Sequence, residues 1–107
     1  MRYGLKLPEW EPGVPYEFER EMGYSEEEFL KVALSLSSQA AHPHPRTVAI
    51  RNGGSLLEIE VLDAWRRELA RMRVPVCRIR FRMTGMDQKE IDEWLARIER
   101  RFQRGGG

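Results

Sequence analysis

Three arginines recur at every second position in the segment 76–83. They are Arg78, Arg80 and Arg82. Because alternate residues of a strand point to the same side, these guanidinium groups should share one exposed face of a sheet. Such a row could hold the phosphates of a nucleic-acid backbone or form part of a contact surface for a partner protein. The segment therefore carries the first candidate binding site.

Acidic residues near the N-terminus form the counterpart of this row. They alternate with aromatic residues and are Glu17, Glu19 and Glu21. If the strand that starts at Tyr16 pairs with the strand 76–83, the glutamates share the face of the arginines, and cross-strand ion pairs cancel most of the positive field. Glu58 and Glu60 should lie on the same face, where RNA-recognition sheets present stacking aromatic residues. Nucleic acid is therefore not the expected partner, and weak binding through the arginine strand is kept as an alternative.

The residues that could bind a metal ion or act as a nucleophile are few. His42 and His44 are the only histidines and Cys77 is the only cysteine. Two imidazoles on a proline-stiffened loop do not close a metal site, because zinc motifs supply four ligands. Cys77 should face the core, where a thiol is inert. We therefore predict no metal, with His42 and His44 as weak candidates, and no cofactor.

Motifs for catalysis are not found in the chain. There is no Ser-His-Asp order, no paired-carboxylate cleft and no glycine loop that would cradle a phosphate. The turn Asn52-Gly53-Gly54 is explained by a hairpin that needs positive φ angles. The sequence therefore favours a protein that is not an enzyme.

The chain ends in Arg104 followed by three glycines. They are Gly105, Gly106 and Gly107. This end resembles the diglycine tails of ubiquitin-like and sulfur-carrier proteins, and the resemblance implies a carrier or modifier that acts through its C-terminal carboxylate. Those proteins have a β-grasp body with one main helix, whereas this sequence predicts three helices. The other interpretation is a helix end followed by a frayed, flexible tail.

The N-terminal segment 1–15 is predicted to be an extended arm. Pro8, Pro12 and Pro15 exclude a helix or a central strand there. Trp10 lies among these prolines, and an indole is costly to leave in water, so it should dock on the domain's own sheet or on another chain. The arm is therefore a second candidate contact surface for a partner.

The segment 16–104 reads as one α+β domain. Strands are predicted from Tyr16 and over 47–51, 56–61 and 76–83, from their period-two alternation. Helices are predicted from the capping residues Ser25, Asp63 and Asp87, and Pro75 should end the second of them. The order strand, helix, strand, strand, helix, strand, helix predicts a ferredoxin-like sandwich, a four-stranded antiparallel sheet with the crossover helices on one face and an extra C-terminal helix.

This topology makes a prediction about charge register. The first and last strands should be neighbours at the centre of the sheet, so that Arg80 lies beside a glutamate of the first strand. An edge position for the last strand, with its arginines unpaired, would argue for the nucleic-acid alternative.

Composition sets the broad class of the protein. A chain of 107 residues with 41% apolar and 33% charged residues corresponds to one soluble globular domain. No stretch approaches the ~20 apolar residues that cross a bilayer, and one cysteine cannot form an internal disulfide, so a cytoplasmic location without membrane contact is expected. The function that fits is a small accessory or protein-interaction domain, self-associating as a homodimer.

Overall fold

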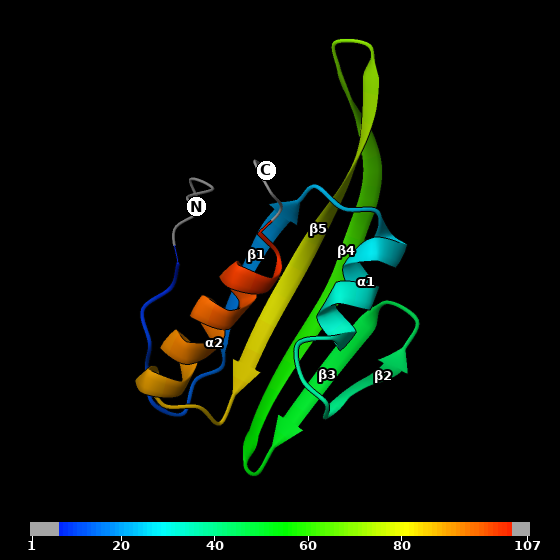
Figure 1. Cartoon of the computed structure of the whole chain (residues 1–107). Coiled ribbons are helices and arrows are strands. Elements are labelled where there is room, and N and C mark those ends of the chain that lie inside the picture. The colour runs from blue at the N-terminus through cyan, green and yellow to red at the C-terminus, as the bar shows by residue number, and fades with distance from the viewer. Residues whose placement is uncertain (1–6, 104–107) are drawn as a thin grey trace.

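The computed structural model describes residues 7–103 and shows one five-stranded antiparallel sheet with two helices packed on one of its faces (Figure 1). The elements in chain order are β1 (Tyr16–Met22), α1 (Glu26–Leu34), β2 (Ala40–His44), β3 (Thr47–Asn52), β4 (Ser55–Leu69), β5 (Met72–Thr84) and α2 (Gln88–Arg101). The strands lie side by side in the order β1-β5-β4-β3-β2. Within the described residues, no helix is long and apolar enough to cross a membrane.

The core lies between the sheet and the two helices. Alternate residues of the strands point into it, as in β5, where Cys77, Ile79 and Phe81 are fully buried between exposed or half-buried arginines. Phe29 of α1 stacks on Phe102, with ring centroids 4.8 Å apart. Period-two burial in the strands and aromatic packing from both helices therefore close one continuous core.

Both helices begin where the sequence predicts. Ser25 forms a complete capping box with Glu28 at the start of α1, and the carboxylate of Asp87 accepts a hydrogen bond from the Glu90 amide at the start of α2. These side chains satisfy amide groups that have no partner within the helix. The capping signals at Ser25 and Asp87 are therefore confirmed.

The ferredoxin-like prediction is wrong. The sheet has five strands instead of four, and two helices instead of three pack on it. The predicted second helix, from Asp63 to Pro75, does not form. Its residues extend β4 and begin β5, which pair with each other from Leu56↔Thr84 to Leu69↔Met72 in one long hairpin.

This error arose because the apolar spacing in residues 63–75 suits both a helix and a hairpin. Trp65, Leu69 and Met72 recur at helical spacing, but in an antiparallel hairpin Leu69 and Met72 face each other across the turn. The Asp63 carboxylate accepts from the next amide, that of Ala64 at 2.9 Å, and does not cap a helix. Pro75 lies within β5, where the strand has no neighbour on the β1 side beyond Cys77, and proline is tolerated at such an edge.

A second correction concerns the predicted loop around the histidines. Ala40–His44 forms β2, an edge strand that pairs with β3 and has an irregular register between Ala41 and His44. Pro43 is compatible with an edge strand because one side of that strand makes no ladder hydrogen bonds.

The predicted pairing of the first and last strands is confirmed, but their predicted position at the centre of the sheet is not. β1 pairs with β5 throughout, and Glu19 is directly opposite Arg80. β1 is the outer strand, however, and β5 lies between β1 and β4. The last strand is therefore flanked by acidic residues on both sides.

Candidate functional site

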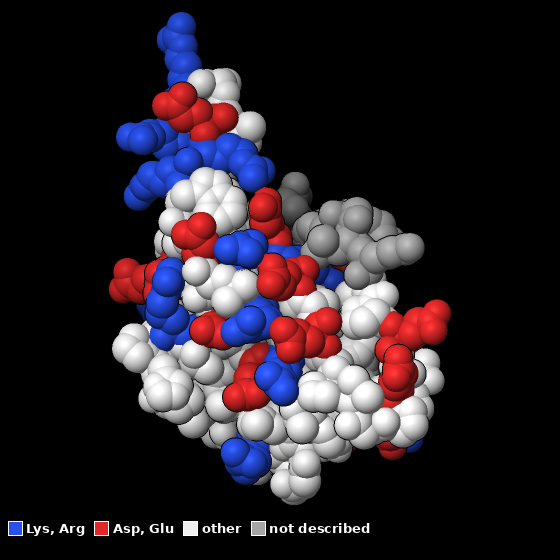
Figure 2. Space-filling model, turned by 180° about the vertical axis from the view of Figure 1, so that it is seen from behind, with Lys and Arg blue, Asp and Glu red and all other residues white. Residues whose placement is uncertain are grey.

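The arginines of β5 take part in a ladder of ion pairs on the face that the helices leave open. Arg80 bonds Glu60 of β4 at 2.5 Å and lies 3.9 Å from Glu17 of β1. Hydrogen bonding to Glu60, and then the charges of Glu60, Glu17 and Glu19, raise the pKa of Arg80 above its usual value. Figure 2 shows red and blue side chains interleaved over this face.

The other two arginines of the row also have acidic neighbours. Arg78 contacts Glu19 at 3.3 Å, and Arg82 lies 3.9 Å from Glu17. These side chains are between about a third and a half exposed, so each pair contributes at most about 1 kcal/mol to stability. The ladder therefore presents little net positive charge, and contact of Arg78, Arg80 and Arg82 with a partner stays a prediction.

Trp10 docks on its own chain. Its indole Nε1 donates a hydrogen bond to the carbonyl of Met86 at 3.1 Å, and its ring packs against the edge of the core. The side chain is half-buried, beside Tyr16 and Ile91. In this structure the described part of the arm, residues 7–15, therefore covers the start of α2, and its use as a partner surface stays a prediction.

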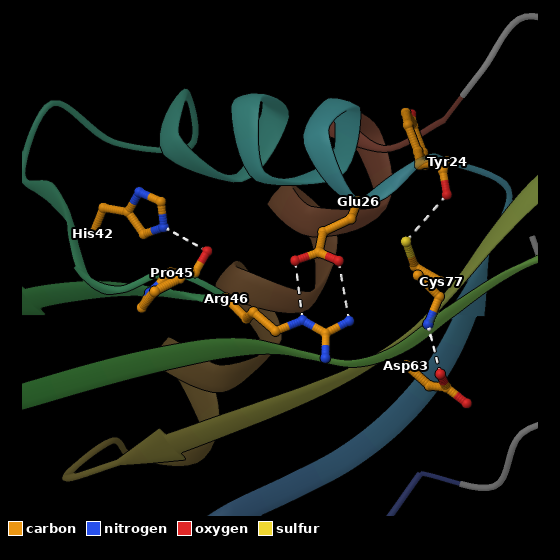
Figure 3. Close-up of polar contacts among 8 residues, drawn as sticks. Tyr24, Glu26, His42, Pro45, Arg46, Asp63 and Cys77 are labelled. Atoms are coloured by element: carbon orange, nitrogen blue, oxygen red, sulfur yellow. Dashed lines mark hydrogen bonds and ion pairs between the residues drawn. The ribbon is translucent and has the colours of Figure 1, made fainter.

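The histidines are exposed on β2. The ring Nε2 of His42 lies 3.0 Å from the carbonyl oxygen of Pro45, as Figure 3 shows. Residues 7–103 contain no group of three or more His, Cys, Asp or Glu side chains that could hold a metal ion. Gly105, Gly106 and Gly107 lie outside the described residues.

Cys77 is fully buried beneath the start of α1. Its thiol donates to the carbonyl of Tyr24 at 3.1 Å (Figure 3). Burial, followed by the nearby charge of Glu26, raises the pKa of this thiol to about 11, although Arg46 acts in the opposite direction. The thiol is therefore protonated at neutral pH and cannot serve as a nucleophile.

The most distinctive feature of the molecule is the outer part of the β4–β5 hairpin, which projects beyond the body of the sheet (Figure 1). We call residues 65–76 the hairpin arm. β1 ends at Met22, opposite Cys77, and the last residue of β3 in register with β4 is Thr47, opposite Glu60. The arm is therefore a two-stranded ribbon with both of its edges open.

One face of the hairpin arm is mostly apolar. Cross-strand partners share a face, and three pairs lie on the side of the charge ladder: Trp65 with Val76, Arg67 with Val74, and Leu69 with Met72. Leu69 is 57% exposed and Met72 is 67% exposed, and no other large apolar side chains of the described strands and helices are as accessible. The tip of the projecting ribbon is therefore a candidate contact surface.

A groove of about 480 Å³ lies between the end of β1 and the hairpin arm. Its walls combine apolar side chains of the arm with the charged ends of β1, and it is lined by Glu19, Arg20, Glu21, Met22, Gly23, Arg67, Leu69, Val74, Val76 and Arg78. Arg67 crosses it to reach Glu21 at 3.2 Å. The groove opens along the free edge of β5, so a contact with the arm would extend into it.

Positive charge gathers on the hairpin arm. Four arginines lie within residues 66–73, against one glutamate, and they are Arg66, Arg67, Arg71 and Arg73. Figure 2 shows this as a concentration of blue side chains on the projecting part of the molecule. Glu68 faces Arg73 across the ribbon, and Arg71 lies in the turn.

This site could not be predicted while residues 63–75 were assigned to a helix that packs on the sheet. One signal favoured a strand: Met72, Val74 and Val76 alternate with Arg73 and Pro75, a period-two pattern whose apolar residues are in phase with Arg78 instead of Cys77.

Comparison with known proteins adds no assignment: no protein family, no curated protein and no solved structure matches this chain. The hairpin arm is therefore interpreted from its own geometry.

Proposed function

We propose that this protein is a non-enzymatic binding module and that the hairpin arm is its contact element. The observation that carries the proposal is the arm itself, a two-stranded ribbon with open edges, an exposed apolar tip and an excess of arginine. An isolated two-stranded hairpin is only marginally stable in water. A ribbon of this kind gains stability when a partner covers its apolar face or pairs with its edges.

The body of the protein supports this function by holding the arm in a defined direction. β4 and β5 both continue from the core into the arm, from Leu57 and Met83 to Leu69 and Met72, with one register shift between Val61 and Asp63. The arm is therefore anchored by the best-packed part of the sheet, which limits the loss of conformational freedom on binding.

Self-association is the second candidate, favoured by the open edge of β5. Antiparallel pairing of two β5 edges would bury Val74 and Met72 of both copies. It would also bring two sets of four arginines into one four-stranded ribbon, and like charges oppose each other. We therefore propose a homodimer only as the alternative use of this edge, within a cytoplasmic protein whose one cysteine has no disulfide partner.

The proposal is tested by photo-crosslinking in the native cell. A photoreactive amino acid at Leu69 is expected to form covalent adducts, because this side chain lies at the contact. The matched control places the same amino acid at Lys89, which is exposed on α2, away from the arm. Equal adduct formation at both positions, or none at Leu69, would contradict the proposal, and a cross-link between two copies would identify the homodimer.

A further inference from the structure

We infer that the hairpin arm binds in the major groove of double-stranded DNA. This inference rests on the function proposed above. The charge of the hairpin arm is complementary to that of DNA. Residues 66–73 hold four arginines and one glutamate, a net charge of +3 within eight residues. Among the contacts of residues 7–103, Arg67 is the one arginine of this segment with an ion pair to the body of the protein, to Glu21. A polyanion is the partner that such a segment attracts.

The arginines of the arm lie on both faces of the ribbon and in its turn. Arg66 and Arg73 lie on the face opposite the apolar stripe, Arg67 lies on the stripe itself, and Arg71 lies in the turn. Positive charge thus surrounds the ribbon on both faces and at its end. The two walls of a groove, each lined with phosphates, would both be within reach of such an arm.

The shape of the arm also suits the major groove. A two-stranded β-ribbon fits into the major groove of B-form DNA, which is ~12 Å wide and ~8.5 Å deep. Five cross-strand pairs, from Trp65↔Val76 to Leu69↔Met72, extend beyond the last pair between β1 and β5. At ~3.3 Å a residue, these pairs reach about 15 Å, which exceeds the depth of the groove. Leu69 and Met72 at the tip would then contact base edges, such as the methyl group of thymine.

Two other nucleic-acid classes fit less well. Single strands are bound by stacking on aromatic side chains, but the arm has only Trp65, which is half-buried at its base. Duplex RNA has a deep and narrow major groove that side chains do not enter. The β5 ladder is also an unsuitable site, because Arg80 is engaged with Glu60 and Glu17.

The test is fluorescence anisotropy with a labelled DNA duplex of about two helical turns. Binding is expected to weaken steeply as salt is raised from about 50 to about 200 mM, because bound arginines release counterions from the phosphates. A double variant, Arg71→Gln with Arg73→Gln, is expected to lower the affinity at least about tenfold and to reduce the slope of log K against log salt by about two. Circular dichroism of the variant checks that it folds.

A matched control removes two arginines from the ladder instead. Arg80→Gln with Arg82→Gln changes the net charge by the same amount and is expected to leave both the affinity and the salt slope nearly unchanged. An equal loss in both variants would overturn the inference, because net charge and not the arm would then govern binding.

Two further outcomes separate this inference from the proposed function. Binding to polyglutamate as strong as to the duplex would overturn the choice of DNA and point to an acidic protein. Adducts at Leu69 that contain only protein would likewise overturn the choice of DNA while leaving the arm as the contact element. An absence of adducts together with an absence of DNA binding would contradict both proposals.

Discussion

At the scale of single residues, side chains of one type have very different environments in this protein. Arg80 lies between glutamates of two neighbouring strands, whereas Arg71 lies in the turn at the end of a ribbon. Cys77 has no exposed surface and donates to a backbone carbonyl. Which groups are available for chemistry or binding is therefore a matter of position and not of residue type.

Burial of Cys77 predicts a loss of stability in alkali. The pKa of the thiol is about 11 in the folded protein and 9.0 without the effects of the fold. The folded state therefore holds the proton more tightly, and this contribution is complete below pH 9 and is lost between pH 9 and about 11. At ~1.4 kcal/mol per pKa unit, the free energy of unfolding should fall by about 3 kcal/mol in all as the thiol loses its proton.

Urea unfolding of the native protein and of Cys77→Ala at several pH values checks this expectation. The variant has no thiol to titrate, so its stability should fall less across the same window, whatever the cavity costs at every pH. Parallel pH profiles for the two proteins would contradict a raised pKa for Cys77.

At the scale of the elements, the turns decide how the strands end. The β3–β4 turn and the connection from β5 to α2 touch at Gly54 and Gly85. A Cβ atom added to Gly85 would clash with the Gly54 carbonyl oxygen, and the φ of Gly85 is +73°. The hydroxyl of Ser55 also donates to the Gly85 carbonyl at 3.2 Å. This contact fixes the base of the long hairpin, at the opposite end from the arm.

Gly85→Ala should therefore be strongly destabilising. The positive φ costs a residue with a side chain roughly 1–2 kcal/mol, and the clash with backbone atoms of Gly54 adds to it. Gly53→Ala is the matched control, because Gly53 has a φ of +61° but no atom within 4 Å of its added Cβ. Thermal unfolding should show a loss for Gly85→Ala at least about 2 kcal/mol larger than for Gly53→Ala. Similar losses in the two variants would mean that the two turns do not touch.

At the scale of the whole molecule, the protein consists of a packed body and a projecting arm. The principal extents are 46 × 28 × 22 Å, and the arm extends beyond the body of the sheet (Figure 1). All residues of the buried core cluster lie in the body, with Cys77 as the last one along the hairpin. The arm therefore contributes little to the buried core, and recognition is its proposed role.

Removal of the arm tests this division. Replacing residues 66–75 with Asn-Gly joins Trp65 to Val76, which already face each other, by a two-residue turn that favours a hairpin. The free energy of unfolding should change by less than about 1 kcal/mol, because no residue of the core cluster is removed. Denaturant unfolding measures the change, and a loss above about 3 kcal/mol would show that the arm is part of the folding unit.

The sequence by itself determined those features that depend on near neighbours. Ser25 and Asp87 marked the helix starts because a cap bonds an amide three residues away. Alternation from Tyr16 and in 76–83 identified β1 and part of β5. Caps and alternation need no knowledge of the remaining chain. The prediction that Arg80 lies beside a glutamate of the first strand depended instead on the expected strand order, and Glu19 is the residue opposite it.

Only the tertiary structure decided the segment 63–75. Its apolar spacing suits a helix or a strand equally, and Ala70-Arg71 lacks the glycine that marks a tight hairpin turn, although Ala70 adopts a positive φ of 56°. The hairpin forms because β4 and β5 are already paired inside the core and their pairing continues outward past one register shift between Val61 and Asp63. The arginines of the arm became a candidate site for the same reason: pairing far along the chain, and not their own sequence, carries the arm beyond the sheet, although Arg67 still reaches Glu21.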